Sequence, residues 1–202
     1  MSAPKRSLLN RAAPASAWMA SIFTQRWRGD TPCSTCWPPS PLRAFEIPPD
    51  RLRDAVRTFT IGKMRGERLE RNGVVIWNDC YNSNPEAVRA MLDVLRATPA
   101  RRRIAVLGEM LELGHAAECL HRQVGRCAAE SGIGALIAVR GAARFIAEEA
   151  VRAGMPAQTV HFFEDPAQAG EFVRQLAAPG DAILFKGSRG VEIERAMEKI
   201  LA

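Results

Sequence analysis

The chain has 202 residues, of which 47% are hydrophobic and 25% charged, as in an ordinary soluble α/β protein with one sizeable core. The net charge of +6 is concentrated in residues 1–44, which hold six cations and one acid, so the remainder carries only +1. That split and the 6% aromatic content argue against a nucleic-acid partner, and no apolar run approaches the roughly 20 residues that span a bilayer.

Residues 1–43 form a leader rich in Pro, Cys and Arg, with no hydrophobic period. We interpret it as an irregular segment without a fold of its own, either disordered or translated from a shifted reading frame. The pair Cys33 and Cys36 has C-x-x-C spacing, but no second cysteine pair or histidine cluster completes a metal site. An odd total of five cysteines favours reduced thiols and a cytoplasmic setting.

A short helix and a hairpin are predicted next. Asp50 is a candidate N-cap for a helix that reaches about Phe59. Asn72-Gly73 is flanked by residues 68–70 and by the apolar run 74–77, and this dipeptide is a strong signal for a two-residue hairpin turn.

From residue 74 onward, apolar strands alternate with amphipathic helices, a pattern typical of βαβ units. The pattern predicts a Rossmann-like three-layer α/β sandwich with a mostly parallel sheet over residues 74–202. The expected strands are 74–77, 104–107, 135–139, 160–163 and 182–185, and the expected helices are 85–97, 116–131, 142–153, 166–177 and 191–201.

Polar loops follow three of these strands. Since ligands bind at the carboxyl ends of strands in open α/β sheets, we expect one site to form from the loops 78–85, 108–114 and 186–190. The strand ends at Arg140-Gly141 and Glu164-Asp165 offer little. Taken singly, these loop residues also allow plainer roles: Asn84 as a helix cap, Asp79 as an acceptor for loop amides, and Glu109 and Glu112 as solvated charges.

The loop Lys186-Gly-Ser-Arg189 is more specific. Two cations and a glycine precede a predicted helix N-terminus, which favours a carboxylate or phosphate ligand. The sequence contains neither the G-x-G-x-x-G dinucleotide fingerprint nor the G-x-x-x-x-G-K-S/T phosphate loop.

His121 is expected to be a packing or capping residue. Cys80 has no neighbouring histidine to activate it as a nucleophile.

Four strings in this order resemble the C-terminal domain of the Mur ligase family, and within it the D-alanyl-D-alanine-adding enzymes. They are Asn78-Asp-Cys-Tyr-Asn-Ser-Asn-Pro85, Val106-Leu-Gly-Glu-Met-Leu-Glu-Leu-Gly114, Leu120-His-Arg-Gln-Val-Gly125 and Leu184-Phe-Lys-Gly-Ser-Arg189. The resemblance covers residues 44–202 and implies that 44–73 are the end of a central domain and a linker, and 74–202 the C-terminal domain.

The resemblance implies an ATP-dependent, ADP-forming amide ligase that adds D-alanyl-D-alanine to UDP-N-acetylmuramoyl-tripeptide during peptidoglycan precursor synthesis in the cytoplasm. In the family, a central domain carries the phosphate loop and Mg²⁺, and the third domain closes over ATP and receives the dipeptide. Because the sequence has no phosphate loop, we expect the chain alone to have negligible ligase activity. We also expect a monomer.

The resemblance also implies roles for single residues, none of them catalytic or metal-binding. Those expected on the nucleotide side are Arg65, Asp79, Tyr81, Asn82 and Asn84. Those expected to bind or surround the dipeptide are Gly108, Glu109, Glu112, Lys186, Gly187, Ser188 and Arg189. One departure from the family is Asn78, which stands where a second aspartate is usual.

Two other readings of the same residues remain open. One is a non-catalytic Rossmann-like module that binds a nucleotide or peptide, since every motif here binds and none performs bond chemistry. The other is a different ligase of the Mur or folylpolyglutamate type, although Lys186-Gly-Ser-Arg189 favours the dipeptide-adding enzymes.

Overall fold

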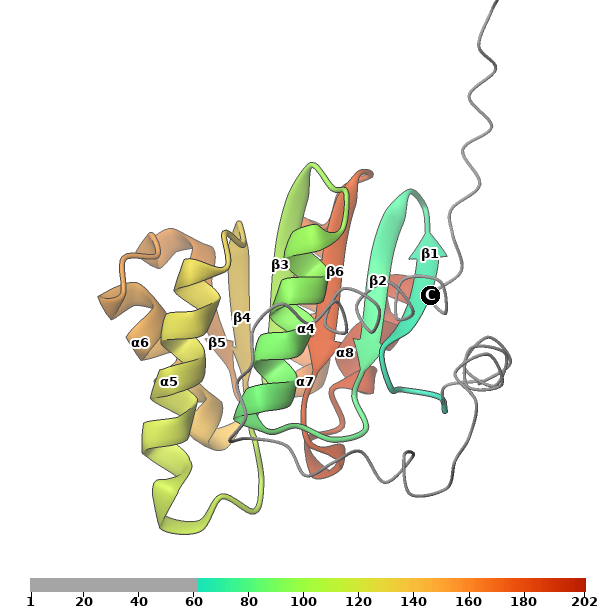
Figure 1. Ribbon diagram of the computed structural model, residues 1–202. Coiled ribbons are helices and arrows are strands. Elements are labelled where there is room, and N and C mark those ends of the chain that lie inside the picture. Colours follow the sequence, from blue (N-terminus) through green and yellow to red (C-terminus); the bar gives the residue numbers. More distant parts are fainter. Residues whose placement is uncertain (1–61) are drawn as a thin grey trace, which may run out of the picture. The chain divides into compact units, whose positions relative to one another are not determined.

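The computed structural model describes residues 62–202, which form a single six-stranded sheet with helices on both faces (Figure 1). The leader, the Cys33–Cys36 pair and the helix predicted after Asp50 lie outside the described residues. The strand order is β1-β2-β6-β3-β4-β5. The strands are β1 (Glu67–Arg71), β2 (Val74–Asp79), β3 (Arg102–Gly108), β4 (Ala135–Val139), β5 (Val160–Phe163) and β6 (Asp181–Lys186). All neighbours pair in parallel except β1 with β2.

Five helices cover the sheet in two layers, which confirms the predicted three-layer sandwich. Helices α4, α5 and α6 pack on one face, and α7 and α8 pack on the other (Figure 1). Their bounds are α4 (Pro85–Ala97), α5 (Ala117–Glu130), α6 (Arg144–Arg152), α7 (Pro166–Leu176) and α8 (Glu194–Leu201).

Strands β2 to β6 contribute side chains to two separate hydrophobic cores, because successive side chains of a strand alternate between the faces of the sheet. In β3, Ala105 and Leu107 join the core under α4, α5 and α6, whereas Ile104 and Val106 join the core under α7 and α8. Both sets are buried, as expected of a parallel sheet covered on both faces. This burial explains the unbroken apolar runs in the sequence.

The predicted hairpin joins β1 to β2. Asn72 and Gly73 have φ angles of 50° and 74°, the left-handed conformation that a tight two-residue hairpin turn requires. The register pairs Glu67 with Asn78 and Arg71 with Val74. Residues 67–71, predicted to precede the domain, are therefore an edge strand of its sheet.

The predicted C-terminal helix begins later than expected. After β6 the chain makes a 3-10 turn (Arg189–Val191), passes through Glu192 in the left-handed conformation and enters α8 only at Glu194. Val191 and Ile193 are buried, and a Cβ on Gly108 or Gly187 would lie within 2.7 Å of Ile193 Cγ1. These apolar residues therefore fill the space beside two glycines instead of starting a helix, and no helix N-terminus directly follows Lys186.

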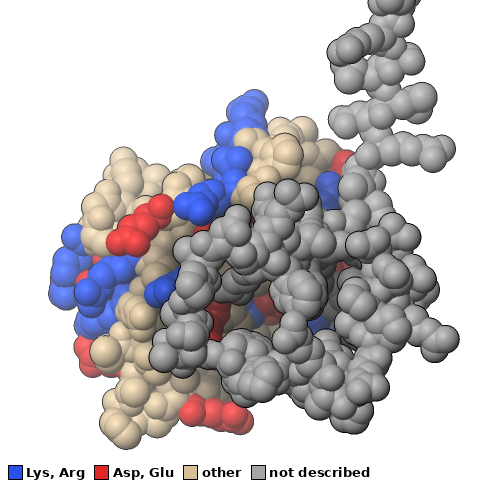
Figure 2. Space-filling model, in the orientation of Figure 1, with Lys and Arg blue, Asp and Glu red and all other residues tan. Residues whose placement is uncertain are grey.

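The remaining predicted bounds agree closely with the structure. Helix 85–97 and strands 135–139 and 160–163 are confirmed as predicted, while the first turn of the helix expected at 142–153 is a 3-10 turn (Gly141–Ala143) before α6. Within residues 62–202, no helix is both long and apolar enough to cross a membrane. On the face drawn in Figure 2, basic side chains form separate groups with acidic ones among them, instead of one continuous basic surface.

Candidate functional site

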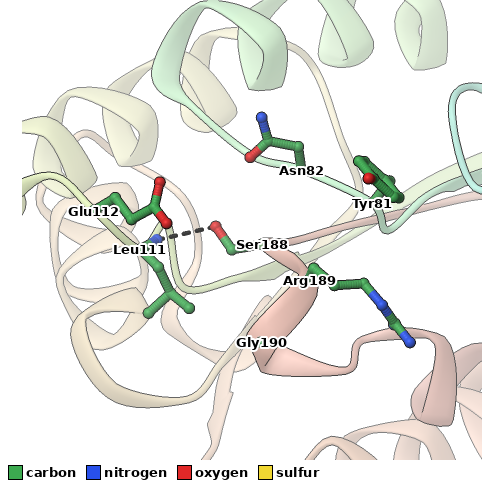
Figure 3. A pocket seen from close by; sticks show the side chains of 7 residues that line it. All are labelled: Tyr81, Asn82, Leu111, Glu112, Ser188, Arg189 and Gly190. Carbon is green, nitrogen blue, oxygen red and sulfur yellow. Dashed lines mark hydrogen bonds between the residues drawn. The ribbon is translucent and has the colours of Figure 1, made fainter.

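The three predicted loops meet at one edge of the sheet, because β6 lies between β2 and β3 and all three strands end there. They enclose a cleft of about 230 Å³ (Figure 3). The cleft is lined by Tyr81, Asn82, Leu111, Glu112, Ser188, Arg189 and Gly190. Leu111 and Gly190 were not predicted as site residues.

A buried ion pair joins the loop after β2 to the end of β6. Lys186 Nζ lies 2.5 Å from Asp79 Oδ2 and donates to the Asn82 carbonyl at 2.8 Å. The Lys186 side chain is 2% exposed and that of Asp79 is 16% exposed. The structure thus pairs a residue expected on the nucleotide side with one expected on the dipeptide side. Asp79 balances the Lys186 charge, and Lys186 fixes the Asp79–Asn82 loop.

Ser188 ties the loop after β6 to the loop after β3. Its hydroxyl oxygen accepts a hydrogen bond from the Leu111 amide at 3.0 Å (Figure 3), and its own amide donates to the Glu109 carbonyl at 3.3 Å. Leu111 is 40% exposed, and a Cβ on Gly190 would lie 2.9 Å from Leu111 Cδ1. Leu111 is therefore an aliphatic part of the cleft wall, held in place by Ser188.

Arg189 pairs with Glu194, the first residue of α8. This hydrogen bond raises the pKa of the Arg189 guanidinium, which is cationic at any physiological pH. Glu194 is mostly covered, with 16% of its side chain exposed. Both cations of the predicted anion-binding loop therefore already have a carboxylate partner.

Arg65 and Tyr81 stack at the other end of the cleft. The Arg65 guanidinium carbon lies 4.0 Å from the centre of the Tyr81 ring, and Tyr81 is 46% exposed. The Tyr81 amide donates to the Met64 carbonyl at 3.2 Å. An exposed aromatic ring with a cation on one face presents a flat, polarised surface beside Asn82.

Asn84 is the N-cap of α4, where its Oδ1 accepts from the Ala87 amide at 2.8 Å. The structure therefore gives Asn84 the simpler of the two roles that the sequence allowed, that of a helix cap. Asn84 is not part of the cleft lining. The adjoining Asn82 turns its own side chain back on the loop, since its Oδ1 accepts from the Ser83 amide at 2.8 Å.

Glu109 faces the loop after β4. Its Oε1 accepts a hydrogen bond from the Ala142 amide at 2.9 Å, and a Cβ on Gly141 would lie 2.5 Å from its Oε2. Gly108 and Gly187 make room for Ile193, as described above. Among the residues that line the cleft, Glu112 has a φ of 65°. Gly108, Glu109 and Gly187 are therefore outside the cleft lining, and their contact with a ligand stays a prediction.

His121 holds the backbone of the loop after β3. Its Nε2 accepts from the Met110 amide at 2.9 Å, and its Nδ1 lies 2.6 Å from the Ala117 carbonyl, to which it donates. Burial lowers the pKa of His121, while the Ala117 carbonyl and the charge of Glu109 act in the opposite direction. The neutral ring protonated on Nδ1 fits both bonds, which confirms the packing and capping role predicted for His121.

Cys80 is fully buried, and its thiol donates to the Phe185 carbonyl at 3.6 Å. Burial is the largest of several causes that raise the pKa of this thiol well above its ordinary range. The charges of Glu194 and Asp79 raise it further. A buried protonated thiol is not a nucleophile, in agreement with the prediction.

The contacts of Asn78 account for its difference from the family pattern, which has an aspartate at this position. Its Nδ2 donates to Glu67 Oε2 at 2.9 Å across the β1–β2 pair, while its Oδ1 is buried without a hydrogen-bond partner among the described residues. A carboxylate at this position would face the carboxylate of Glu67. Between residues 62 and 202, no three His, Cys, Asp or Glu side chains gather as metal ligands.

Comparison with known proteins identifies the family that the four sequence strings resemble. The family model described as "Mur ligase, glutamate ligase domain" matches residues 64–189. A relative from Bacillus subtilis named UDP-N-acetylmuramoyl-tripeptide--D-alanyl-D-alanine ligase is 32% identical over 78% of this chain and 35% of its own length. A Synechocystis protein of the same name is 32% identical over 72% of this chain and 32% of its own. The chain thus spans about a third of the length of these relatives.

Solved structures show the same fold. A MurF ligase from Thermotoga maritima in complex with ADP superposes with a TM-score of 0.64 at 25% identity, over 79% of this chain and 35% of that one. A MurF structure from Acinetobacter baumannii gives a TM-score of 0.68 at 24% identity, over 79% of this chain and 35% of that one. With the family model matched over residues 64–189, the chain belongs to the Mur ligase family.

Proposed function

We propose that this chain carries the C-terminal domain of an ATP-dependent, ADP-forming ligase that adds D-alanyl-D-alanine to UDP-N-acetylmuramoyl-tripeptide in peptidoglycan precursor synthesis. We further propose that it acts in the cytoplasm as a monomer. The observation that carries the proposal is the cleft itself, whose walls come from three of the four strings that resemble this family. The names of the relatives and of the structure with ADP support it.

One end of the cleft suits a nucleotide. The exposed Tyr81 ring and the Arg65 cation stacked on it offer contacts for an aromatic base or a phosphate, and Asn82 lines the same wall. Asp79 is partly exposed and is held in place by Lys186, so its carboxylate is positioned to accept from a ribose hydroxyl. Asn84 contributes indirectly, because it starts α4 and thereby shapes this loop.

The other end suits the dipeptide. Ser188, Arg189 and Glu112 provide polar groups around the cleft, and Leu111 provides an apolar wall for small methyl groups. Lys186 contributes by fixing the loop rather than as a free charge, since Asp79 already neutralises it. Gly108, Glu109 and Gly187 hold the two loops at the spacing that leaves the cleft open.

In this function the chain binds and orients its substrates and excludes water from the reacting carboxyl group, which is electrostatic and positional catalysis. ATP supplies the phosphoryl group that activates the acceptor carboxylate. Mg²⁺ finds no ligand set among residues 62–202, so we assign it to a domain with a phosphate loop, as in the family. The printed sequence has no such loop, and we propose that the chain alone has negligible turnover.

Calorimetric titration of the purified chain tests the binding part of this proposal. We expect D-alanyl-D-alanine and ADP each to bind, and L-alanyl-L-alanine and L-glutamate to bind at least tenfold more weakly. Selectivity for L-glutamate would instead indicate the folylpolyglutamate branch. A Mycobacterium tuberculosis folylpolyglutamate synthase with ADP shares the fold, at a TM-score of 0.53 and 16% identity.

An activity assay tests the catalytic part. The chain is mixed with ATP, Mg²⁺, UDP-N-acetylmuramoyl-tripeptide and D-alanyl-D-alanine, and phosphate release is followed. We expect no release above the rate without the dipeptide. Steady release that depends on the dipeptide would contradict the claim that the isolated chain is inactive.

A further inference from the structure

Arg140 contacts the wall of the cleft from a strand end that the sequence did not single out, although it is not itself among the residues that line the cleft. It follows β4 directly, and β4 lies beside β3 in the sheet. Arg140 is exposed, and its Nη1 donates to the carbonyl of Gly190 at 2.9 Å. Since Gly190 lines the cleft, the Arg140 guanidinium is anchored at the cleft wall.

Arg140 has no carboxylate partner within residues 62–202, unlike the two cations of the loop predicted to bind an anion. Lys186 pairs with Asp79 and Arg189 pairs with Glu194, whereas Arg140 makes no ion pair within residues 62–202. The nearby Glu164 carboxylate faces the amide of Gly141, at 3.3 and 3.4 Å. A guanidinium has five N–H donors, so the bond to Gly190 leaves others for a ligand.

The backbone of Arg140 is strained and firmly held. Its φ of 71° and ψ of 138° lie in a region that glycine favours and other residues rarely adopt. The Arg140 amide donates to the Phe163 carbonyl at 2.9 Å, and its own carbonyl accepts from the Ala143 amide at 3.0 Å. Glycine would relieve the strain at this position. Strained residues that the surrounding structure holds in place cluster at functional sites, which points to a role for the side chain.

We propose that Arg140 provides the positive charge that binds the C-terminal carboxylate of the incoming dipeptide, at the Gly190 end of the cleft. The inference rests on the function proposed above and names a residue for it. Its planar donor fork matches a carboxylate, and its bond to Gly190 keeps it beside Ser188 and Arg189. Lys186 and Arg189 then shape the cleft through their own ion pairs.

The test measures the affinity of the 202-residue chain and its variants for two probes, D-alanyl-D-alanine and D-alanyl-D-alaninamide, which lacks the carboxylate. We expect R140G and R140A to weaken binding of the acid by about tenfold or more, the range of one charge-assisted hydrogen bond. Binding of the amide should change less than twofold. R140K keeps the charge without the fork, so we expect an intermediate loss.

The choice of glycine and alanine separates binding from folding. R140G relieves the positive φ, so its Tm is expected to equal or exceed that of the wild type, whereas R140A keeps the strain. A weaker affinity in a variant that is no less stable cannot come from unfolding. The matched control is R144A, which removes an exposed arginine near Arg140 whose guanidinium stacks on Phe145 instead. We expect R144A to bind both probes as the wild type does.

The outcomes distinguish this inference from the function beneath it. If the wild type binds the dipeptide and R140G and R140A bind it equally well, the role of Arg140 is wrong and the proposed function stands. An equal loss for acid and amide, or a loss for ADP instead of the dipeptide, also overturns the carboxylate contact. If the wild type does not bind the dipeptide, both the inference and the dipeptide-adding function are overturned.

Discussion

At the cleft, Lys186 forms a buried ion pair with Asp79, and Arg189 pairs with Glu194 at the start of α8. Lys186 looked like a free cation in a glycine-containing loop, because nothing in the order of residues shows that Asp79 lies opposite it in the β2–β6 register. Arg140 was not predicted as a site residue, because the sequence does not show where it lies. Its place depends on β4 lying next to β3 and on a backbone angle that no local motif encodes.

Removal of Lys186 should destabilise the fold as well as the site. In K186M, Asp79 loses its partner at a largely buried position, which we expect to lower the free energy of unfolding by about 3 kcal/mol. Urea unfolding measures the change. The control D93A breaks the Arg96–Asp93 pair, whose side chains are both 63% exposed, and should cost less than about 1 kcal/mol. Equal small effects would show that the Asp79–Lys186 pair is not structurally important.

His121 should make stability depend on pH in one direction. The pKa of His121 is lower in the folded chain than in the unfolded chain. Its contribution to the free energy of unfolding is therefore complete above about pH 6.5, and is lost as the pH falls toward the pKa of the folded chain. The protonated ring also cannot accept from the Met110 amide. Urea unfolding at pH 7.5 and 5.5 should therefore show a larger loss for the wild type than for H121Q. A parallel loss in both would contradict this account.

Elements were predicted well wherever a local pattern decides them. Asn84 and Pro85 start α4 as expected, and the apolar run at 135–139 is β4. The prediction was wrong at the start of the C-terminal helix, where Val191 and Ile193 precede α8 (Glu194–Leu201) instead of forming its first turn. Their burial beside Gly108 and Gly187 depends on contacts distant in sequence, so the periodicity alone misplaced the helix start.

The contact between α7 and α8 depends on Gly170. A Cβ there would lie 2.5 Å from the Ala196 carbonyl oxygen and 2.6 Å from its Cα, so the backbones themselves would have to separate. Alanine favours a helix by about 1 kcal/mol, but overpacking costs about 1–3 kcal/mol, and contact with rigid backbone places G170A at the high end. The net loss is about 2 kcal/mol, so we expect a Tm lower by about 4–8 °C, measured by calorimetry.

The control for this prediction is Q168A, at an exposed position of the same helix. It should change the free energy of unfolding by no more than about 0.5 kcal/mol. A G170A variant as stable as Q168A would mean that α8 moves away freely. The Arg189–Glu194 pair at the start of α8 would then not depend on this packing.

At the scale of the whole molecule, residues 61–202 form one compact unit that contains both cores and the cleft. We expect a chain of these residues alone to unfold in one cooperative transition and to bind D-alanyl-D-alanine with the affinity of the full chain. Calorimetry and titration measure both. Loss of binding on truncation would show that residues 1–60 contribute to the site.

The point where the chain enters this unit has a mechanical consequence. The Met64 carbonyl accepts a hydrogen bond from the Tyr81 amide and Arg65 lies on the Tyr81 ring, so the turn through which the chain enters this unit is attached directly to the cleft wall. A rigid rotation of the unit about residues 62–66 displaces each atom in proportion to its distance from that pivot. The side of the cleft formed by Tyr81 is then displaced very little, whereas the helices farthest from the pivot are displaced most. The contacts proposed for a nucleotide at the Tyr81 wall would therefore move least in such a rotation.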